Sequence, residues 1–328
     1  MSFKICLVGC GNMSVAAHGP SIKHYVDKHA DTVFAACCDL DEARAKDFRE
    51  KFGAKAHYTC IDKMLATEKP DAVCLIAPIE LTADISCQIL SQGYPLILEK
   101  PPGRDTAETT RMIQAAGSTP TKVAFNRRYM PLVQKLGAII RELDAKILDI
   151  SYRMLRVNRF DPDFSGTAIH GVDLVLHVAG DYYEEITFRY NDVRGASNFH
   201  MFGTMANGIV VNLDFLPVSG LHAEQMEINT DKGHFSLKLP LNHGIDGMGS
   251  LTHYVDNKPV LEVSGHEAAG LDEEFIHGGF YHENALFFDE IKSGKRPAGD
   301  IMACLQSVEV AYGLSRKHKT YKNGGPNA

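Results

Sequence analysis

The sequence predicts an α/β protein with two domains, and three observations support this prediction. Its 328 residues exceed the ~150 residues typical of one domain. Up to about residue 125, short apolar runs alternate with amphipathic helical stretches. Beyond that point, strand-like runs separated by turn-forming residues fill most of the chain. We therefore expect a doubly wound parallel sheet over 1–125 and, over 126–328, an α+β domain with an open, mostly antiparallel sheet.

The N-terminal sheet follows from five apolar runs typical of strands: FKICLVG, TVFAACCD, DAVCLIAP, YPLILEKP and TKVAF. Helical patterns such as EARAKDFREKFG and TAETTRMIQAAG separate them. Strands that are apolar throughout are buried on both faces, and the intervening helices allow parallel connections. The pattern therefore favours a parallel sheet with helices on both sides.

The C-terminal domain begins with the helical stretch MPLVQKLGAIIRELD, the strand ILDISYRMLRV and a helix within DFSGTAIHGVDLVLHVAG. Several strand-like runs follow. Asn-Gly at 207–208 and Asp-Lys-Gly at 231–233 favour hairpins between neighbouring strands. The last stretches, HENALFFDEIKSG and ACLQSVEVAYGLSR, are helical again and can pack on either domain.

Composition narrows the class of protein. The net charge is −7, with no block of basic residues, whereas nucleic-acid binding depends on clustered Lys and Arg. No apolar run reaches about 18 residues, and the N-terminus lacks a signal-peptide pattern. We therefore expect a cytoplasmic protein without nucleic-acid or membrane partners. Its cysteines form no CxxC pair, and we expect buried free thiols at Cys6, Cys10, Cys37, Cys38, Cys60, Cys74 and Cys87.

A glycine-rich loop follows the first strand. In GCGNMS, Gly9 allows a tight turn and Gly11 lets the backbone approach a pyrophosphate. Ser14 replaces the third glycine of the dinucleotide-binding pattern, where a small residue is needed for close packing. The start of the next helix offers free amide hydrogens to an anion. These features predict a Rossmann-type cofactor site.

Asp39 ends the second predicted strand, where a carboxylate can accept hydrogen bonds from ribose hydroxyls. It lies further beyond Gly9 than the usual spacing of about 20 residues, which a longer first helix explains. An acid here repels a 2′-phosphate and favours NAD over NADP. The alternative is that Asp39 caps the helix at 41–52.

Glu99 and Lys100 end the strand in LEKPPGR, at the sheet edge where doubly wound folds bind ligands. Lys100 could donate a hydrogen bond to a substrate oxygen. Taken alone, Lys100 would be interpreted as an exposed surface residue.

Together these motifs resemble the glucose-fructose oxidoreductase and inositol dehydrogenase family, Gfo/Idh/MocA. The resemblance rests on VGCGNM, Asp39, IAP at 76–78, SQGYPLILEKP, FNRRYMP at 125–131, HGVDLVLHVAG at 170–180 and FYHENALFFDEIKSGKRP. It implies an NAD(P)-binding domain followed by a domain that binds substrate and mediates oligomerisation, giving a homodimer or homotetramer. Position by position it assigns the cofactor to Gly9, Gly11, Asn12, Met13, Asp39, Pro78, Glu99 and Lys100.

The resemblance also implies that His170 is the catalytic histidine and that Lys100 is a second catalytic residue. Oxidation of an alcohol needs a base for the hydroxyl proton, and the reference pKa of His, ~6.5, suits that role. Lys100 could stabilise the developing alkoxide. We expect NAD(P)-dependent hydride transfer to or from a sugar, sugar acid or cyclitol.

Two positions depart from the family pattern. Thr82 stands where the family usually has His. Gly166 stands where an acid usually precedes the catalytic histidine by four residues. Asp161, Asp163, Tyr152 or a water could replace that acid, and the sequence does not choose among them. The missing side chain could also enlarge the pocket.

Other polar residues around His170 could bind a substrate or a metal ion. Arg128 and Arg156 could bind an acidic or phosphorylated sugar, with Asp163 beside them, because Arg forks bind carboxylates and phosphates. A neutral sugar or cyclitol is an equal alternative. His170, Asp173 and His177 share a helix face, but we expect no metal, because this spacing is much less specific than a His-Glu-Xaa-Xaa-His motif.

Two other functions remain open at this point. A non-catalytic NAD-binding sensor or regulator would keep the fold and lose the chemistry, and Gly166 favours it. NAD-assisted glycoside hydrolysis would oxidise a sugar transiently and consume no net cofactor.

Overall fold

The computed structural model describes residues 2–161 and 163–324. The chain divides into two compact units, Met1–Asn126 with Gly279–Val308 and Arg127–Gly278 with Glu309–Ala328. A segment near the C-terminus therefore returns to the N-terminal unit.

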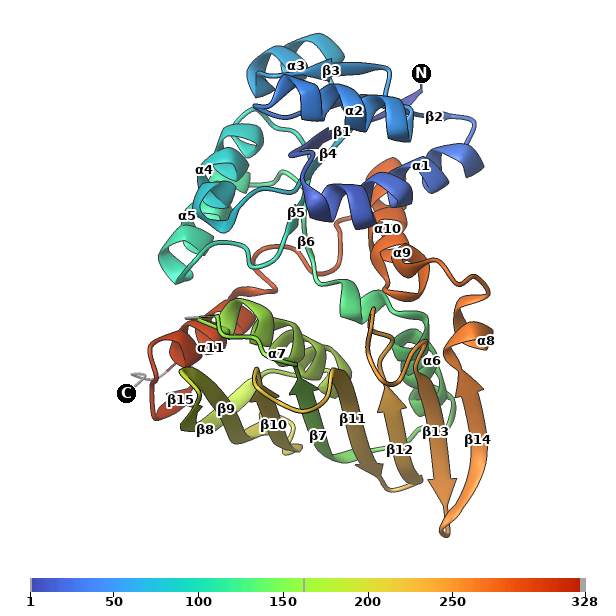
Figure 1. The fold of residues 1–328 in the computed structure, drawn as a ribbon, viewed down its shortest axis with the longest axis vertical. Helices are drawn as coiled ribbons and strands as arrows, with labels where there is room; N and C mark the ends of the chain where they lie inside the picture. Colours follow the sequence, from blue (N-terminus) through green and yellow to red (C-terminus); the bar gives the residue numbers. More distant parts are fainter. Residues whose placement is uncertain (1, 162, 325–328) are drawn as a thin grey trace. The chain divides into compact units, whose positions relative to one another are not determined.

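The first unit contains an α/β sheet (Figure 1). Its elements are β1 (Phe3–Val8), η1 (Ser14–His18), α1 (Gly19–Lys28), β2 (Thr32–Cys38), α2 (Glu42–Phe52), β3 (Ala56–Tyr58), α3 (Ile61–Glu68), β4 (Ala72–Leu75), α4 (Ile79–Leu90), β5 (Leu96–Glu99), α5 (Thr106–Ala116), β6 (Thr121–Ala124) and α10 (Phe280–Lys292).

The six strands lie in the order β3-β2-β1-β4-β5-β6, and all neighbours are parallel. Helices α1 and α10 pack together, as do α4 and α5 on the other side of the sheet (Figure 1). The central strand β4 is buried throughout, as its unbroken apolar sequence predicts. The predicted doubly wound sheet is confirmed.

The second unit contains a larger sheet. Its elements are η2 (Asn126–Tyr129), which begins at the junction, α6 (Pro131–Glu142), β7 (Ile147–Leu155), α7 (Ser165–Ala179), β8 (Tyr183–Val193), β9 (Ala196–Met205), β10 (Val210–Leu216), β11 (Ala223–Thr230), β12 (Gly233–Lys238), β13 (Ser250–Val255), β14 (Lys258–Ser264), α8 (Gly265–Ala269), α9 (Glu274–His277), α11 (Leu305–Ser315), which crosses from the first unit, and β15 (Thr320–Lys322).

This sheet has nine strands in the order β14-β13-β12-β11-β7-β10-β9-β8-β15. The predicted hairpins form: β9 pairs with β10 across Asn-Gly, and β11 pairs with β12 across Asp-Lys-Gly. Among the described strands of this second sheet, only β7 and β10 pair in parallel. The open, mostly antiparallel sheet is therefore confirmed.

Helix α7 packs closely on β7 because of Gly171. A Cβ added there would come within 2.2 Å of the Tyr152 ring and 2.7 Å of the Phe215 ring. Side chains from α6, α7 and the sheet then form one apolar cluster that includes Leu132, Val172 and Leu213. The residue beside His170 thus sets how closely its helix approaches the sheet.

Some features differ from the sequence analysis. The short strands β3 and β15 have three residues each, too few for a period to be recognised, and the pair β13–β14 also escaped prediction. All eight cysteines of the sequence are free thiols. Cys60 is exposed rather than buried, because it lies at the N-cap of α3, and Cys87 is only half-buried.

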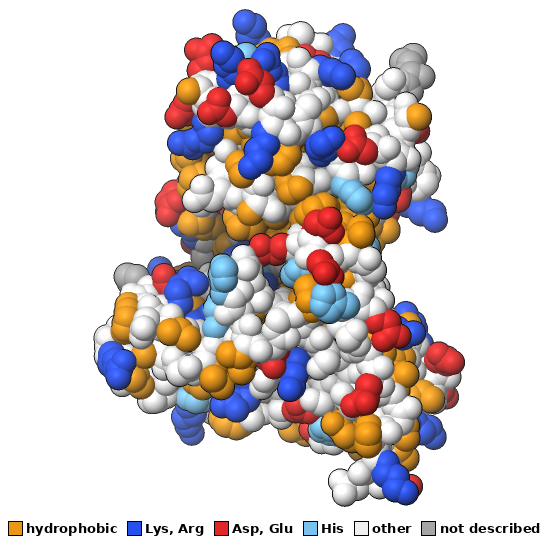
Figure 2. Space-filling model, turned by 45° about the vertical axis from the view of Figure 1, so that its right-hand side comes forward, with side chains coloured by type: hydrophobic (Ala, Val, Ile, Leu, Met, Phe, Trp, Pro, Cys, Tyr) orange, Lys and Arg blue, Asp and Glu red, His pale blue; other side chains and the backbone are white. Residues whose placement is uncertain are grey.

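Charged side chains of both signs are interspersed on the face drawn in Figure 2. Within residues 2–161 and 163–324, no helix combines the length and apolar character needed to cross a bilayer.

A buried ion cluster stabilises the second unit around Glu224, which is fully buried. Arg127 donates to both of its carboxylate oxygens, at 2.6 and 2.5 Å. Arg156 donates to Oε1, and the Tyr152 hydroxyl donates to Oε2 at 2.8 Å. Burial alone would raise the pKa of Glu224, but the two guanidinium charges outweigh it and hold that pKa far below its usual value.

We predict that Glu224→Gln lowers the free energy of unfolding by about 3–5 kcal/mol at pH 7, because it leaves two buried guanidinium groups uncompensated. The folded-state pKa is depressed, so Glu224 contributes fully above the ordinary value of 4.5 and its contribution is lost as the pH falls below it. Denaturant unfolding of wild type and variant at pH 7 and pH 3 measures this difference.

The matched control is Glu227→Gln, on the same strand but partly exposed, which should cost less than about 1 kcal/mol. Equal losses for both variants would contradict the assigned role of Glu224.

Candidate functional site

A cavity of about 730 Å³ lies in the first unit, at the carboxyl ends of its strands. This volume is within the range of small-molecule and cofactor sites. The cavity reaches from the end of β1 to the loops after β2, β3 and β4. Its lining includes Val8, Gly9, Gly11, Cys38, Asp39, Leu40, Asp41, Arg44, Cys60, Ile61, Ile76, Pro78, Leu81 and Gln88.

The loop after β1 is shaped by Gly9 and Ser14. Gly9 has a φ of +91°, and a Cβ there would lie 1.9 Å from the carbonyl oxygen of Ile76. Ser14 is fully buried, and its hydroxyl donates to the Gly9 carbonyl. The residue that replaces the third glycine thus closes the loop with a hydrogen bond of its own.

Gly11 serves a different purpose. A Cβ added there would meet no atom of the described residues within 4 Å, its chain neighbours aside. The backbone is therefore open on the cavity side, as close approach of a pyrophosphate requires. Asn12 and Met13 follow at the start of the helical segment, and both are exposed.

Asp39 joins the loop to β2. Its Oδ2 accepts from the Cys10 amide at 2.8 Å and its Oδ1 from the Asp41 amide at 3.0 Å. The N-cap of α2 is Asp41, which accepts from the Arg44 amide. The helix-cap reading of Asp39 is therefore wrong, and its carboxylate lines the cavity. These features fit the adenosine and pyrophosphate of a dinucleotide.

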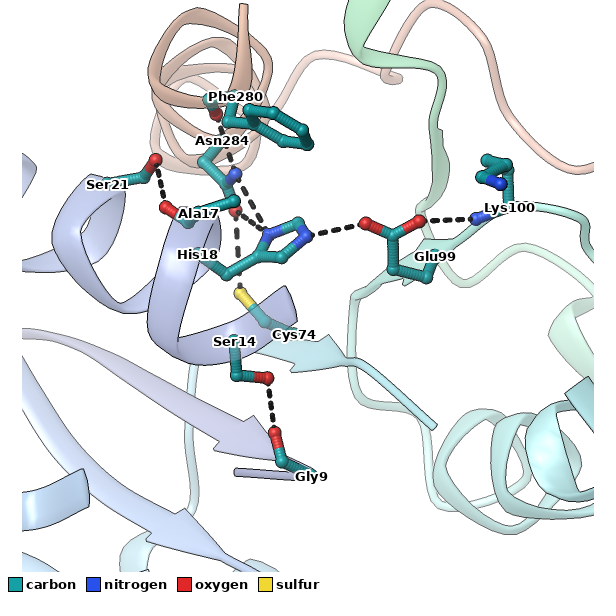
Figure 3. Close-up of polar contacts among 10 residues, drawn as sticks. All are labelled: Gly9, Ser14, Ala17, His18, Ser21, Cys74, Glu99, Lys100, Phe280 and Asn284. Atoms are coloured by element: carbon teal, nitrogen blue, oxygen red, sulfur yellow. Dashed lines mark hydrogen bonds and ion pairs between the residues drawn. The ribbon is translucent and has the colours of Figure 1, made fainter. Parts of the chain in front are cut away.

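Glu99 and Lys100 lie at the end of β5, and two residues that the sequence analysis missed hold them (Figure 3). His18 Nε2 lies 2.9 Å from Glu99 Oε1, and the other oxygen, Oε2, accepts from the Lys100 amide at 3.1 Å. Asn284 on α10 contacts the Nδ1 side of His18. Burial raises the pKa of Glu99, but the hydrogen bond from His18 and the charge of Lys100 outweigh it, and this pKa is lowered.

Pro78 and Thr82 complete the edge between β4 and α4. Pro78 is the N-cap of α4 and lines the cavity. Thr82, at the position of the family histidine, is buried and donates to the Pro78 carbonyl at 3.1 Å. Thr82 therefore supports the turn that presents Pro78.

In the second unit, His170 lies on α7, half-buried. One turn further, Asp173 is buried and accepts two hydrogen bonds from the Arg128 guanidinium, at 2.6 and 2.5 Å. This ion pair fastens α7 to η2. His177 is exposed. Across the described residues, no three His, Cys, Asp or Glu side chains are grouped so that they could hold a metal ion.

The region before His170 shows what surrounds the missing acid. A Cβ added at Gly166 would meet nothing within 4 Å among the described residues, apart from its neighbours and its own helix backbone. Asp163 accepts from the Ser165 amide at 2.8 Å at the start of α7. Asp161 pairs with Arg159 at 2.8 Å. Tyr152 is fully buried against Glu224.

Comparison with known proteins concerns the first unit above all. Residues 3–126 match the model of GFO_IDH_MocA, the oxidoreductase family with an NAD-binding Rossmann fold. Over this segment the chain is similar to the Gfo/Idh/MocA oxidoreductases.

Two curated relatives of this chain are dehydrogenases by name. Inositol 2-dehydrogenase 1 of Paenarthrobacter aurescens is 26% identical over 57% of this chain and 56% of its own. D-xylose 1-dehydrogenase (NADP(+)) 2 of Haloferax volcanii is 29% identical over 42% of this chain and 45% of its own. The chain thus spans about half the length of each.

A solved structure matches the fold of nearly the whole chain. An oxidoreductase from Agrobacterium radiobacter, in complex with NAD+, L-tartaric acid and magnesium, superimposes with a TM-score of 0.80 over 99% of both chains. At 19% identity, this likeness concerns the fold.

We predict that Gly9→Ala and Gly11→Ala separate folding from binding. Gly9→Ala should lower the free energy of unfolding by more than about 2 kcal/mol, because an alanine is strained at positive φ and meets the Ile76 carbonyl. Gly11→Ala should change stability by less than about 0.5 kcal/mol but weaken NAD+ binding at least about tenfold. Thermal unfolding measures the stability of both variants, and calorimetric titration measures their NAD+ affinity. Full NAD+ affinity in Gly11→Ala would contradict the pyrophosphate contact assigned to the Gly11 backbone.

Proposed function

We propose that the protein is a dehydrogenase or reductase that transfers a hydride between NAD and a hydroxyl or carbonyl group of a sugar, sugar acid or cyclitol. One observation carries the proposal: a single unit holds the Gly9 loop, the cavity-lining Asp39 and the Glu99–Lys100 pair at the carboxyl ends of strands in one parallel sheet. The dehydrogenase relatives support the substrate class. A homodimer or homotetramer and a cytoplasmic location stay predictions.

Lys100 is proposed to act on the substrate oxygen. The cofactor supplies the acceptor or donor of hydride when it is bound. While the alcohol carbon loses hydride, negative charge develops on its oxygen, and the Lys100 ammonium can stabilise that charge. The backbone amide of Lys100 donates to the Glu99 carboxylate. This hydrogen bond fixes the backbone from which the Lys100 side chain extends.

His170 is proposed to take the hydroxyl proton, because imidazole changes protonation near neutral pH. Its helix is held by the Arg128–Asp173 ion pair. Lys100 and His170 belong to different units, and each role rests on the family motif and on the side chain's own surroundings.

Substrate binding is proposed for Arg128, Arg156 and Asp163. Arg128 and Arg156 each have a carboxylate partner, Asp173 and Glu224. These pairs give both arginines a second role in holding the second unit together. A variant of either one therefore needs a stability measurement beside the assay.

The first prediction concerns turnover. Wild type with NAD+ should reduce the cofactor in the presence of at least one compound from a panel of sugars, sugar acids and cyclitols, followed by NADH absorbance. Lys100→Met and His170→Ala should each lower kcat by about 100-fold or more, with NAD+ still bound by Lys100→Met. NAD+ binding without turnover of any compound would instead favour the regulator, and release of an aglycone without NADH would favour NAD-assisted hydrolysis.

The second prediction concerns the choice between NAD and NADP. Asp39 and Asp41 outnumber Arg44, which lies 3.7 Å from both carboxylates, so a 2′-phosphate meets net negative charge and NAD+ is preferred. Asp39→Ser should shift the ratio of NADP+ to NAD+ affinity about tenfold or more toward NADP+, because Arg44 is released to the phosphate.

Asp41→Ser is the matched control for this shift. Serine keeps the helix cap, so the preference should move much less than in Asp39→Ser. Equal shifts in the two variants would contradict the ribose contact assigned to Asp39.

The third prediction concerns Gly166. Asp at this position lies one helical turn before His170, and its Cβ would meet no atom of the described residues within 4 Å beyond its neighbours and its own helix backbone. Gly166→Asp should fold and should move the acidic limb of the kcat/KM–pH profile upward by about half a unit to one unit, because a carboxylate favours the imidazolium. Gly166→Asn is the uncharged control and should leave that limb in place. An unmoved limb in Gly166→Asp would exclude His170 as the titrating base.

A further inference from the structure

We propose that His18, itself oriented by Asn284, is a positioning residue that holds the Glu99 carboxylate against the Lys100 backbone and thereby sets the preference of the site for NAD+ over NADH. This inference rests on the proposed NAD-dependent function. It assigns a role to His18 and Asn284. In the sequence, His18 lies 81 positions from Glu99 and 266 positions from Asn284.

The orientation of Asn284 is fixed by its helix. Its Nδ2 lies 2.7 Å from the Phe280 carbonyl oxygen, and because a carbonyl only accepts, the nitrogen must be the atom on that side. The same nitrogen lies 3.2 Å from His18 Nδ1, closer than the amide oxygen at 3.5 Å. Asn284 therefore donates to His18 Nδ1.

This contact determines the tautomer of His18. A ring nitrogen that accepts a hydrogen bond carries no proton, so the proton of the neutral ring lies on Nε2. Nε2 then donates to Glu99 Oε1 at 2.9 Å. The His18 ring also packs edge-on against Phe280, with centroids 6.0 Å apart, and its exposed fraction is 2%. Figure 3 shows the His18 ring between Asn284 and Glu99, with Phe280 beside it.

Glu99 receives hydrogen bonds on both oxygens. His18 donates to Oε1 and the Lys100 amide to Oε2. Its side chain is only 12% exposed, so water cannot easily replace the imidazole as a donor. Both hydrogen bonds favour the ionised carboxylate, and together they fix its direction.

The place of this carboxylate follows from the strand order. The cavity with Asp39 covers the β2, β1 and β4 ends, and β5 is the next strand beyond β4. A dinucleotide with its adenosine in the cavity and its pyrophosphate at the Gly9 loop extends its second nucleoside toward β5. Glu99 and Lys100 then lie beside the nicotinamide.

The two charges act oppositely on the nicotinamide. The ring is a cation in NAD+ and neutral in NADH, so an adjacent carboxylate stabilises the oxidised form and an ammonium destabilises it. A Glu99 that loses its His18 donor turns away or takes up a proton, and Lys100 then dominates. The affinity for NAD+ should fall while that for NADH changes little.

The experiment compares the dissociation constants of NAD+, NADH and ADP-ribose, by calorimetry, for wild type, His18→Leu, His18→Gln and Glu99→Gln. ADP-ribose lacks the nicotinamide and reports only on the adenosine and pyrophosphate contacts. We expect the ratio of the NAD+ to the NADH constant to rise about tenfold in His18→Leu and Glu99→Gln, the effect of one hydrogen bond to a charged group. ADP-ribose should bind all four within about threefold.

Two variants distinguish positioning from packing. His18→Gln keeps a donor near the place of Nε2 and should restore the ratio to within about threefold of wild type. His29→Leu is the matched control, a half-buried histidine at the far end of α1 whose Nδ1 contacts the Tyr25 carbonyl, and it should leave the ratio unchanged. If His18→Leu does not fold, Glu99→Gln and His18→Gln carry the test.

An unchanged ratio in Glu99→Gln, or equal weakening of all three ligands in His18→Leu, would overturn the inference while leaving the proposed function intact. A wild-type protein that binds ADP-ribose but neither NAD+ nor NADH would contradict the proposed function, and the inference with it.

Discussion

The close approach of Gly9 to the Ile76 carbonyl is the constraint on which the first unit depends. It brings the end of β1 against the segment that follows β4, so that the loops after both strands line one cavity. Asp39 fastens the end of β2 to the same loop through the Cys10 amide. The strand order places β5, with Glu99 and Lys100, directly beyond β4. The cavity and the Glu99–Lys100 pair therefore lie along the same edge of the sheet, and Gly9 is the residue that allows β1 and the segment after β4 to meet there.

The local chemistry of the loop and strands could be predicted from the sequence, because each signal lies within one segment. Gly9, Asp39 and the Glu99–Lys100 pair each end or follow an apolar strand. Sequence reasoning left Asp39 open between a ribose contact and the cap of α2, and the hydrogen bond from the Arg44 amide to Asp41 excludes the cap. An acid beside a helix start can cap the helix, as Asp41 does, or line a ligand site, as Asp39 does. The sequence alone does not distinguish the two roles.

Contacts between distant segments could not be predicted in this way. His18 and Asn284 meet because η1 and α1 pack on α10. His18 lies outside the recognised motifs, and the FYHENALFFDEIKSGKRP segment that contains Asn284 does not point to His18. The same holds for Glu224, which lies far along the chain from Arg127 and Arg156 and pairs with both inside the second unit. Of these two, Arg156 is a substrate candidate in the sequence analysis. Arginine-rich segments predict an anion nearby, and that anion can belong to the protein itself.

The central claim is that a dinucleotide binds with its adenosine ribose at Asp39 and its nicotinamide beside Glu99 and Lys100. The most direct test is a crystal structure of the protein with NAD+. The account predicts ribose hydroxyls within hydrogen-bond distance of the Asp39 carboxylate, the pyrophosphate against the Gly9–Gly11 backbone and the nicotinamide at the end of β5. Electron density for NAD+ elsewhere, or with the nicotinamide at Asp39, would contradict it.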